Sequence, residues 1–383
     1  MMNIQLLNKI AAVGLNQLDD SYKVGENVEN PDGIMVRSAA MHEMEFEPSL
    51  KAIARAGAGV NNIPIERCSE NGIVVFNTPG ANANGVKELA ICALLLAARD
   101  VVGGIAWANT LTEDVAKQVE KGKSKFAGTE LMGKTLGVIG LGAIGGKIAN
   151  TAIHLGMNVI GCDPFLSIEG AWNLNHRVSR AATYDEVFEK SDYITLHVPA
   201  TKDTKNMICT ESIAKMKNGV KIINLSRADL VNAAELKAAL AEGKVSAYVT
   251  DFPTEEVINT PGVVAIPHLG ASTEESEDNC AVMAARELDD YLKNGNIKNS
   301  VNYPNVEMPR SGAARICVLH QNVPSILTKI TAAVADEGLN IENMTNKSKG
   351  ENAYTVLDIS STPSEDAIAR ISAVEGINRV RVI

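Results

Sequence analysis

The chain has 383 residues, of which 45% are hydrophobic and 4% aromatic, and its formal net charge is −10. One hydrophobic core rarely serves so long a chain, which predicts two or three domains of ordinary α/β composition. The acidic balance excludes a general nucleic-acid binder, because such a protein needs positive surface to displace counterions from phosphates. The six cysteines include no C-x-x-C pair. We therefore expect no metal, no disulfide framework and a reduced, cytoplasmic setting.

The longest apolar run, residues 89–98, has ten residues. It is shorter than the roughly 18 residues that a membrane-spanning helix needs, so we interpret it as a buried helix and expect no membrane association. The first residues contain no basic segment followed by an apolar stretch and a small-residue cleavage site. No secretory signal is therefore predicted.

Short apolar runs alternate with helical patterns from about residue 30 to residue 290, which predicts parallel sheets covered by helices on both faces. The first predicted strands end in small or polar residues. Ligands of open α/β sheets bind beyond the carboxyl ends of strands, so we expect substrate contacts at these endings. These strands are residues 33–39, 51–59 and 72–80.

A helix is predicted from Val86 to about Asp100, and a charged, weakly patterned region then extends to Lys134. A second parallel sheet begins at Thr135, and a long helix at residues 274–294 closes it. The later strands of this sheet are predicted at residues 157–163, 192–198, 220–226, 245–250 and 263–268.

Residues 302–312 contain two prolines and a glycine with little periodicity, which is typical of a linker. The remaining residues follow a β-α-β-β-α-β order, which predicts a ferredoxin-like domain. Its predicted elements are a strand at 314–320, a helix at 326–337, strands at 339–346 and 353–360, a helix at 364–374 and a strand at 378–383.

These patterns predict an α/β protein with two doubly wound parallel-sheet domains, one inserted into the other, and a small C-terminal domain. The predicted divisions are a substrate-binding domain at residues 1–95 and 285–302, a nucleotide-binding domain at 96–284, a linker at 303–312 and the C-terminal domain at 313–383.

Gly140, Gly142 and Gly145 stand in G-x-G-x-x-G spacing after an apolar strand and at the start of a helix. In a dinucleotide site these glycines permit a tight turn, approach of the backbone to the pyrophosphate, and close packing of helix on strand. The alternative is a glycine-rich turn without a ligand. Asp163, at the end of the next strand, favours the nucleotide site. Because no arginine follows that acid in residues 164–167, we predict NAD rather than NADP.

Three polar residues follow later strands in the order Arg227, Glu255 and His268. Oxidation of a 2-hydroxy acid needs a cation for the carboxylate, a base for the hydroxyl proton and a partner that orients this base. An arginine, a histidine and a glutamate fit these roles. Each has an ordinary alternative: a strand cap, a solvated loop acid and a core histidine.

These residues lie in stretches that resemble the D-2-hydroxyacid dehydrogenases over nearly the whole chain. The resemblance rests on A-R-A-G-A-G-V-N-N-I, N-T-P-G-A-N-A-N-G-V-K-E-L-A, L-G-V-I-G-L-G-A-I-G, L-H-V-P-A-T-K-D-T-K-N-M-I, I-N-L-S-R-A-D-L-V-N, D-F-P-T-E-E and P-H-L-G-A-S-T-E-E-S. It implies that His268 is the acid/base, that Glu255 is its partner, and that Arg227 binds the carboxylate and carbonyl. It also implies that backbone amides at Ala58, Gly59 and Val60 hold the carboxylate.

The resemblance further implies a set of NAD contacts at strand ends and in the glycine-rich loop. In the family an Asp precedes a V-F-x-x-E stretch and contacts the nicotinamide amide. Here Thr250 occupies that position and Asp251 comes one residue later, so we assign the contact to Asp251. The remaining implied contacts are Ala143, Ile144, His197, Val198, Pro199, Thr204, Leu225, Ser226 and Gly270.

The segment V-R-S-A-A resembles the R-S motif with which members acting on phosphoglycerate hold the substrate phosphate. It assigns Arg37 and Ser38 to the phosphate, and Asn82 matches a nearby polar contact. The alternative is that Arg37 and Ser38 only end a strand.

The tail resembles ACT domains, small amino-acid-sensing modules of biosynthetic enzymes, in H-Q-N-V-P-S and G-L-N-I-E-N. His320, Asn322 and Asn340 match positions that bind L-serine between paired ACT domains. Ser325 stands where the family pattern has Gly. The alternative is a purely structural dimerisation module.

We therefore expect an NAD-dependent dehydrogenase that acts on a phosphorylated 2-hydroxy acid, 3-phosphoglycerate, at the entry to serine synthesis. The resemblance implies a homodimer or homotetramer. The alternatives are a hydroxypyruvate or glyoxylate reductase, which needs no phosphate pocket, and a non-catalytic, NAD-sensing corepressor-like scaffold.

Overall fold

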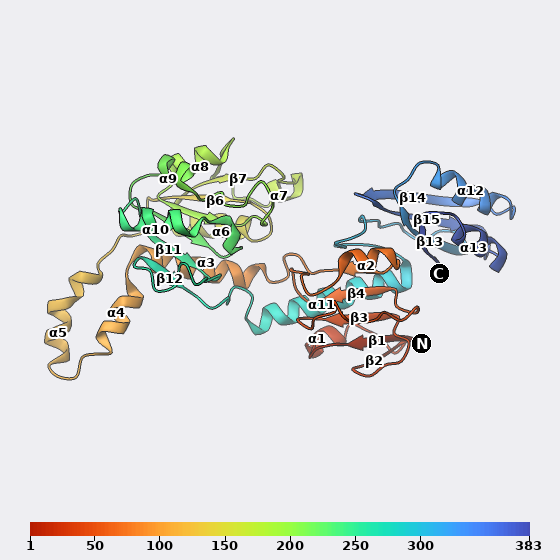
Figure 1. The fold of residues 1–383 in the computed structure, drawn as a ribbon, viewed down its shortest axis with the longest axis horizontal. Coiled ribbons are helices and arrows are strands. Elements are labelled where there is room, and N and C mark those ends of the chain that lie inside the picture. Colours follow the sequence, from red (N-terminus) through yellow and green to blue (C-terminus); the bar gives the residue numbers. More distant parts are fainter. The chain divides into compact units, whose positions relative to one another are not determined.

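The computed structural model describes all of residues 1–383, which form two compact units (Figure 1). Unit one comprises Met1–Asn82 and Glu277–Ile383, and unit two comprises Ala83–Ser276. The divisions that we predicted at residues 95/96 and 284/285 fall inside helices α3 (Ala83–Ala98) and α11 (Glu274–Asn294), whereas the units divide near the start of each helix.

Unit one contains a five-stranded parallel sheet with the order β2-β1-β3-β4-β5. This is a doubly wound order. Ligands of such sheets bind at the switch point, where the strand order reverses, which here lies between β1 and β3. The strands β3 and β5 are wholly buried, because parallel strands are covered on both faces. The elements are β1 (Met2–Leu6), α1 (Ala12–Leu15), β2 (Tyr22–Gly25), β3 (Gly33–Val36), β4 (Ala52–Arg55), α2 (Ile65–Glu70) and β5 (Val74–Phe76).

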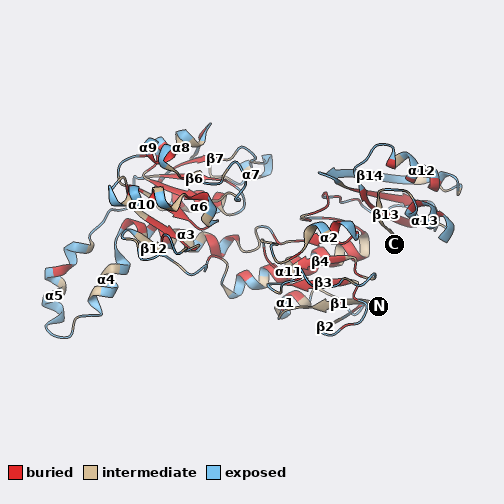
Figure 2. Ribbon diagram, in the orientation of Figure 1, coloured by how far each residue is buried: buried red, intermediate tan, exposed pale blue.

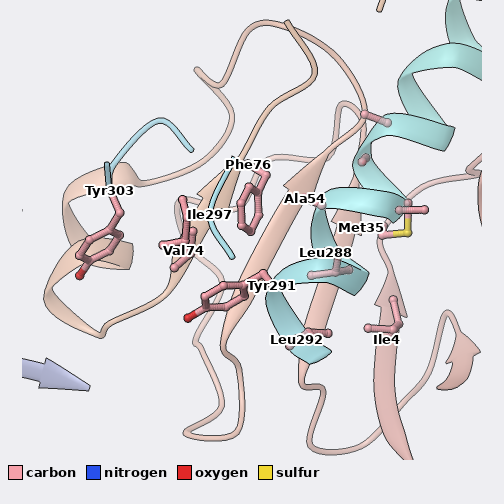
Figure 3. Packing of buried hydrophobic residues seen from close by; sticks show 14 of the residues in the cluster. Ile4, Met35, Ala54, Val74, Phe76, Leu288, Tyr291, Leu292, Ile297 and Tyr303 are labelled. Carbon is pink, nitrogen blue, oxygen red and sulfur yellow. The ribbon is translucent and has the colours of Figure 1, made fainter. Parts of the chain in front are cut away.

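The core of this sheet is formed with α11, whose apolar side chains pack across the strands (Figure 3). Leu288 and Tyr291 of α11 have no exposed surface, nor have Met35 and Phe76 of the sheet. The chain approaches α11 closely at Gly14, where a Cβ would lie 2.5 Å from the Cβ of Ala281. A larger residue at Gly14 would therefore separate α1 from α11.

Unit two contains a seven-stranded parallel sheet with the order β12-β11-β10-β9-β6-β7-β8. If β6 is counted as strand 1 and the sheet is read from β8, the order is 3-2-1-4-5-6-7. This is the 3-2-1-4-5-6 arrangement of the Rossmann fold with one strand added. The five inner strands are mostly buried, the two edge strands β8 and β12 have no buried residue, and the covering helices have exposed outer faces (Figure 2). The strands are β6 (Thr135–Ile139), β7 (Asn158–Cys162), β8 (Val178–Arg180), β9 (Tyr193–Leu196), β10 (Val220–Asn224), β11 (Val245–Thr250) and β12 (Val263–Ala265). The helices are α3, α4 (Val101–Ala108), α5 (Val115–Gly122), η1 (Lys123–Phe126), α6 (Gly145–His154), α7 (Ile168–Trp172), α8 (Tyr184–Lys190), α9 (Thr210–Lys215), η2 (Ala228–Leu230) and α10 (Ala233–Ala241).

The weakly patterned region after residue 100 forms an arm of α4, α5 and η1 that extends away from the sheet of unit two (Figure 1). Within the arm, the rings of Trp107 and Phe126 lie 5.3 Å apart. Val102 and Ile105 are 47% and 58% exposed, so α4 presents an uncovered apolar side. No single helix is long and apolar enough to cross a membrane, and only the pair α3 and α4, bent by 72°, satisfies length and composition together.

The C-terminal part of unit one has the predicted β-α-β-β-α-β order and a four-stranded antiparallel sheet, β14-β15-β13-β16. One face of this sheet packs on its two helices around Ile316, Ile330 and Ile371. The elements are β13 (Ala314–Gln321), α12 (Ile326–Ala335), β14 (Ile341–Lys349), β15 (Asn352–Ile359), α13 (Glu365–Ser372) and β16 (Ile377–Val382). We call this part the C-terminal module.

The C-terminal module is packed on the rest of unit one through buried polar contacts. Arg315 and Asp358 form an ion pair whose side chains are wholly buried. Arg315 also donates to the carbonyl oxygens of Asn294 and Met308, at 2.8 and 2.9 Å. Residues 303–312, which we predicted as a linker, are packed in their first part and exposed from residue 309 on: Tyr303 and Val306 are buried, and Val306 exchanges backbone hydrogen bonds with Ile297. The connection is therefore a fixed segment.

Candidate active site

The glycine-rich loop of unit two has the geometry that its motif predicts. Gly140 has a φ of 87°, and a Cβ there would lie 2.4 Å from the carbonyl oxygen of His197. A Cβ on Gly145 would lie 1.9 Å from the carbonyl oxygen of Gly140, so only glycine lets α6 begin so close to the loop. Nothing lies within 4 Å of a Cβ on Gly142. The backbone of the loop, with Ala143 and Ile144, is thus open to a pyrophosphate at the start of α6.

Asp163 lies directly after β7 and contacts this loop. Its Oδ2 accepts a hydrogen bond from the amide of Leu141 at 2.9 Å, and its Oδ1 accepts one from Phe165 at 2.9 Å. The carboxylate is half-buried, and each oxygen keeps a lone pair for a further donor. The predicted ribose-binding acid is therefore held at the edge of the nucleotide loop by two backbone amides.

The carboxyl ends of β9 and β10 carry further predicted NAD contacts. His197 bonds through Nε2 to Thr195 Oγ1 at 2.7 Å, while its buried Nδ1 has no partner. Burial lowers the pKa of His197 to about 3, so the ring is neutral at physiological pH. Ser226 and Thr204 donate their hydroxyl hydrogens to the carbonyls of Leu196 and Pro199, each at 2.6 Å. Val198 follows the end of β9, and Leu225 follows the end of β10.

Arg227 and His268 are brought together by a residue that the sequence did not single out. The guanidinium carbon of Arg227 lies 5.5 Å from the ring centroid of Phe252, and the imidazole centroid of His268 lies 4.4 Å from the same ring. Both side chains are exposed. Glu255 is also exposed and makes no hydrogen bond to His268 in this structure. Two of the three predicted catalytic residues therefore share one aromatic neighbour, and the third is not paired.

Asp251 accepts a backbone hydrogen bond from the amide of His268 at 3.0 Å and is 1% exposed. Its Oδ2 accepts a hydrogen bond from the amide of Gly270 at 3.1 Å, whereas its Oδ1 is buried without a partner. Burial raises the pKa of Asp251 above its ordinary value. Thr250 Oγ1 accepts a hydrogen bond from the amide of Phe252 at 3.0 Å. A buried carboxylate oxygen without a donor fits a ligand that brings one, such as a carboxamide group.

In unit one, Asn8 at the end of β1 organises the loop after β3. Its Oδ1 accepts hydrogen bonds from the amides of Arg37, Ser38 and Ala39, at 3.0, 2.9 and 2.9 Å. This is the switch point between β1 and β3, where a ligand of this fold is expected. Asn8 was not predicted, because its role depends on residues about 30 positions away in the chain.

The predicted phosphate-binding residues Arg37 and Ser38 are exposed at this loop. Arg37 Nη2 lies 2.5 Å from Oε1 of Glu277, and the two side chains are 45% and 43% exposed. An ion pair so exposed contributes little to stability and is readily exchanged for another anion. The structure thus gives Arg37 an internal carboxylate partner, which the sequence pattern did not predict.

The loop after β4 is shaped by Gly57, whose φ is 151°. Arg55 lies against it: a Cβ on Gly57 would be 1.8 Å from Arg55 Nη1, and Arg55 Nε donates to the carbonyl of Arg37 at 3.1 Å. The amides of Ala58, Gly59 and Val60 donate no hydrogen bond. Three free amides beside a guanidinium are donors that suit a carboxylate, and we therefore call residues 58–60 the carboxylate cradle. Arg55 was not predicted, although its place at the end of a strand was the available signal.

Asn82, the last predicted substrate contact, ends the first of the two segments of unit one and is half-buried. It stands one residue before α3 and makes no hydrogen bond with its side chain. No group of three or more His, Cys, Asp or Glu side chains is placed to hold a metal ion.

The predicted effector residues lie at opposite ends of the C-terminal sheet. His320 is 1% exposed, and its ring nitrogens bond to Thr355 Oγ1 at 2.8 Å and to the carbonyl of Gln321 at 2.7 Å. Burial lowers its pKa. Asn322 donates to the carbonyl of Gly350, whereas Asn340 precedes the other end of β14 and donates to Glu342. Within one chain these three side chains do not form one site.

The serine that replaces the expected glycine keeps the backbone of that position. Ser325 has a φ of 64°, in the left-handed region, and stands immediately before α12. This is a conformation that glycine adopts freely and other residues adopt at some cost. Ser325 therefore adopts a backbone conformation that would suit the expected glycine.

The sequence matches a family described as D-isomer specific 2-hydroxyacid dehydrogenase, NAD binding domain, over residues 95–270. A protein of Escherichia coli (strain K12) is 32% identical over 347 residues, which are 87% of this chain and 82% of that protein. The chain therefore belongs to the D-isomer specific 2-hydroxyacid dehydrogenase family. The predicted resemblance and the predicted NAD cofactor are confirmed.

The Escherichia coli relative is a D-3-phosphoglycerate dehydrogenase. The protein with the same name in Methanocaldococcus jannaschii is 34% identical over 346 residues, 88% of this chain and 64% of that protein. The solved structure of NAD+-bound 3-phosphoglycerate dehydrogenase from Entamoeba histolytica matches at 30% identity with a TM-score of 0.60, covering 79% of this chain and 98% of that one. The chain spans 52–64% of the length of three curated relatives with this name.

Proposed function

We propose that this protein oxidises D-3-phosphoglycerate at C2 to 3-phosphohydroxypyruvate with NAD, the first step of L-serine biosynthesis. The observation that carries the proposal is the pair Arg37 and Arg55 at neighbouring strand ends, beside the free amides of the carboxylate cradle. Two cationic groups and a set of free amides suit a small acid with two anionic groups, which 3-phosphoglycerate is. The names of the relatives support the same substrate.

In this proposal each unit contributes a separate part of the chemistry. Unit one holds the substrate: residues 58–60 bind the carboxylate, and Arg37, Ser38 and Asn82 bind the phosphate. Unit two holds the dinucleotide through the glycine-rich loop and Asp163, and Asp251 Oδ1 accepts a hydrogen bond from the carboxamide. Bound NAD supplies the acceptor for the hydride from C2.

His268 takes the proton of the C2 hydroxyl group, and Arg227 binds the carboxylate and polarises the C2 oxygen. Phe252 lies beside both side chains. Glu255 serves as the partner that stabilises the imidazolium once it turns toward His268. This last role requires a rearrangement, because the two side chains do not bond in the present structure.

The test is NADH oxidation with phosphohydroxypyruvate, hydroxypyruvate and glyoxylate under one set of conditions. We expect kcat/KM for phosphohydroxypyruvate to exceed that for hydroxypyruvate by about 100-fold, because charge-assisted hydrogen bonds between an arginine and a phosphate contribute a few kcal/mol. Arg37→Gln should remove most of this preference and leave hydroxypyruvate turnover unchanged. Equal rates with both oxo acids in the wild type would reject the phosphate assignment.

The second candidate is a hydroxypyruvate or glyoxylate reductase, and the Arg37–Glu277 ion pair is the observation that favours it. A carboxylate partner lowers the attraction of Arg37 for a phosphate. Glu277→Gln distinguishes the two functions. It should raise the affinity for phosphohydroxypyruvate if Arg37 binds the phosphate, and it should have no effect on either oxo acid if the enzyme is a reductase.

We also propose that the C-terminal module is an ACT domain that binds L-serine between two copies. The separation of Asn340 from His320 and Asn322 within one chain supports this, since two copies would bring the two ends together. Inhibition by added L-serine that Asn322→Ala abolishes would support the site. The buried, fully bonded His320 argues for a positioning role. A module that dimerises without any response to serine is the alternative outcome.

The exposed apolar side of α4 supports a homodimer formed through unit two, with a tetramer possible through the C-terminal module. Ile105→Glu should lower the native mass by half if α4 lies in the interface, because a buried unpaired carboxylate is strongly unfavourable. Val13→Glu, at another exposed apolar residue, is the matched control. The composition supports a cytoplasmic location.

A further inference from the structure

Residues 299–302, which we call the strap, run antiparallel to the end of β5. Ser300 is bridged to Phe76, and the amide of Val301 donates to the carbonyl of Val75 at 2.9 Å. Phe76 itself faces the core beside Ile297 (Figure 3). The strap therefore extends the sheet at the point where β5 ends and the loop to α3 begins.

A buried acid holds the first residue of the strap. Oε1 of Glu287, on α11, accepts a hydrogen bond from Asn299 Nδ2 at 2.7 Å, and Glu287 is 7% exposed. Asn299 has a φ of 58°, a conformation that residues other than glycine rarely adopt. The other oxygen of Glu287 is buried without a partner. A buried carboxyl oxygen without a partner costs free energy, so packing alone does not explain an acid at this position.

The strap is connected to the carboxylate cradle by two further hydrogen bonds. The carbonyl of Asn299 accepts from the amide of Asn77 at 3.3 Å, and Asn77 Nδ2 donates to the carbonyl of Ala58 at 2.6 Å. In the next residue, the amide of Thr78 donates to the carbonyl of Gly57 at 3.1 Å. A continuous chain of hydrogen bonds thus runs from Glu287 through Asn299 and Asn77 to the cradle.

The C-terminal module holds the same strap from a second direction. Lys349 Nζ, at the end of β14, donates to the carbonyl of Ser300 at 2.8 Å, and Asn352 Nδ2 donates to the carbonyl of Asn302 at 3.0 Å. The β-turn that follows Lys349 is itself held by Asn322, whose amide donates to the carbonyl of Glu351 at 2.8 Å. The strap is therefore shared by the sheet of unit one and the module.

We propose that Glu287, Asn299 and Lys349 are positioning residues for the substrate carboxylate. They fix the strap, the strap fixes Asn77, and Asn77 aligns the amides of residues 58–60. The inference rests on the proposed function only in that the substrate is a carboxylic acid held by these amides. It does not depend on the phosphate. It also makes the C-terminal module a structural partner of the carboxylate cradle.

The test compares Glu287→Leu, which removes the acceptor, with Glu287→Gln, which keeps an oxygen for Asn299. For each we would measure kcat and KM with phosphohydroxypyruvate and with hydroxypyruvate, the Kd of both oxo acids for the NADH complex, the Kd of NADH and the melting temperature. We expect Glu287→Leu to raise KM and Kd for both oxo acids by the same factor, about tenfold, which corresponds to one misplaced hydrogen-bond donor. NADH binding should not change, and Glu287→Gln should stay within about twofold of the wild type.

Lys349→Met provides a second test on the surface, where folding is not at risk. It should raise KM for both oxo acids by about threefold without a change in NADH binding. Lys347→Met is the matched control, because Lys347 lies two residues earlier on the same strand and makes no hydrogen bond with its side chain. A lower melting temperature with unchanged Kd for both oxo acids in Glu287→Leu, or equal effects of the two lysine variants, would overturn the inference.

These outcomes separate the inference from the function on which it rests. If the wild type prefers hydroxypyruvate, the phosphoglycerate assignment fails, yet the variants still test the cradle with hydroxypyruvate. If the wild type neither turns over nor binds any 2-oxo acid, the proposed function is overturned and the inference with it. Unchanged oxo-acid binding in Glu287→Leu, in an active wild type, overturns the inference alone.

Discussion

The nucleotide loop at residues 140–145 and the carboxylate cradle at residues 58–60 both follow a parallel strand, and both depend on glycine, yet they are held in different ways. The nucleotide loop is shaped by contacts within itself and with the neighbouring strand end, such as that between Gly140 and Gly145. The cradle is shaped by side chains from elsewhere, including Asn77 and, through the strap, Glu287. A site formed by local backbone can be recognised from a short motif, whereas a site formed by distant side chains cannot.

The largest effect that we expect comes from a side chain in unit two. His268→Ala should lower kcat by about 1000-fold, within the range for loss of a general acid/base, while the Kd of NADH stays within about twofold. His268 contacts Phe252 and lies outside the glycine-rich loop, so nucleotide binding should be independent of it. Stopped-flow turnover and NADH fluorescence titration measure the two quantities. A parallel loss of NADH binding would contradict the separation of chemistry from nucleotide binding in unit two.

The second prediction tests whether contacts within the nucleotide loop determine its structure. Gly145→Ala places a methyl group 1.9 Å from a backbone oxygen, so the start of α6 must move. We expect a loss of about 1–3 kcal/mol in stability and about a 100-fold weaker binding of NADH.

Gly142→Ala is the matched control for that variant, since its Cβ meets nothing within 4 Å in the free protein. It should keep the stability of the wild type and weaken only NADH binding, because the methyl group would stand where the pyrophosphate approaches. Calorimetry and fluorescence titration separate these effects. Equal destabilisation by both variants would show that the loop is not held by the Gly140–Gly145 contact.

The third prediction addresses the other kind of loop, the one that side chains hold. Asn8→Ala removes the acceptor of three backbone amides and should let the segment of Arg37 and Ser38 relax. We expect KM for phosphohydroxypyruvate to rise about tenfold, with little change for hydroxypyruvate, because only the phosphate is bound there. Asn8→Asp keeps an acceptor oxygen and should lie close to the wild type. An equal rise in KM for both oxo acids would mean that Asn8 acts on the binding of the carboxylate instead.

Sequence reasoning succeeded where the determining contacts were local. All strands of unit two except β8, the ferredoxin-like order of the tail and the glycine-rich loop were predicted, because alternating apolar runs and turn residues determine them. It missed β1 and β2, which are short and only partly buried, and it left the arm of α4 and α5 unassigned because its apolar residues are not covered within the chain.

The candidate site shows the same limit at the level of single residues. Arg227 and His268 were predicted from their positions after strands, and the structure gives both one aromatic neighbour. Asn8, Arg55 and Glu287 were not predicted, because each acts through a contact with a residue distant in sequence or through burial. The pairing of Glu255 with His268 stays a prediction, since it depends on a side-chain rearrangement.

The smallest effect that we expect is a change in the stability of the folded state with pH. Burial raises the pKa of Glu287 from 4.5 to about 8, with Lys298 and Asn299 partly offsetting the shift. A carboxyl group whose pKa is raised on folding stabilises the folded state fully below its unfolded pKa, and this contribution is lost as the pH rises through the folded value. We therefore expect the wild type to lose about 1 kcal/mol of stability relative to Glu287→Gln between pH 7 and pH 9.

Unit two should respond in the opposite direction. The pKa of His197 falls from 6.5 to about 3, so the neutral folded ring is favoured above pH 6.5 and its contribution is lost as the pH falls toward 3. His197→Gln should therefore be relatively more stable than the wild type at pH 5 and lose that advantage at pH 8. Melting temperatures of the wild type and both variants at these pH values measure the difference directly, since other titrating groups cancel between variant and parent.

The same measurement has an outcome that would contradict the prediction for Glu287. Parallel curves of melting temperature against pH for Glu287→Gln and the wild type between pH 7 and 9 would mean that Glu287 is ionised in the folded protein. The strap would then be held by a charged hydrogen bond.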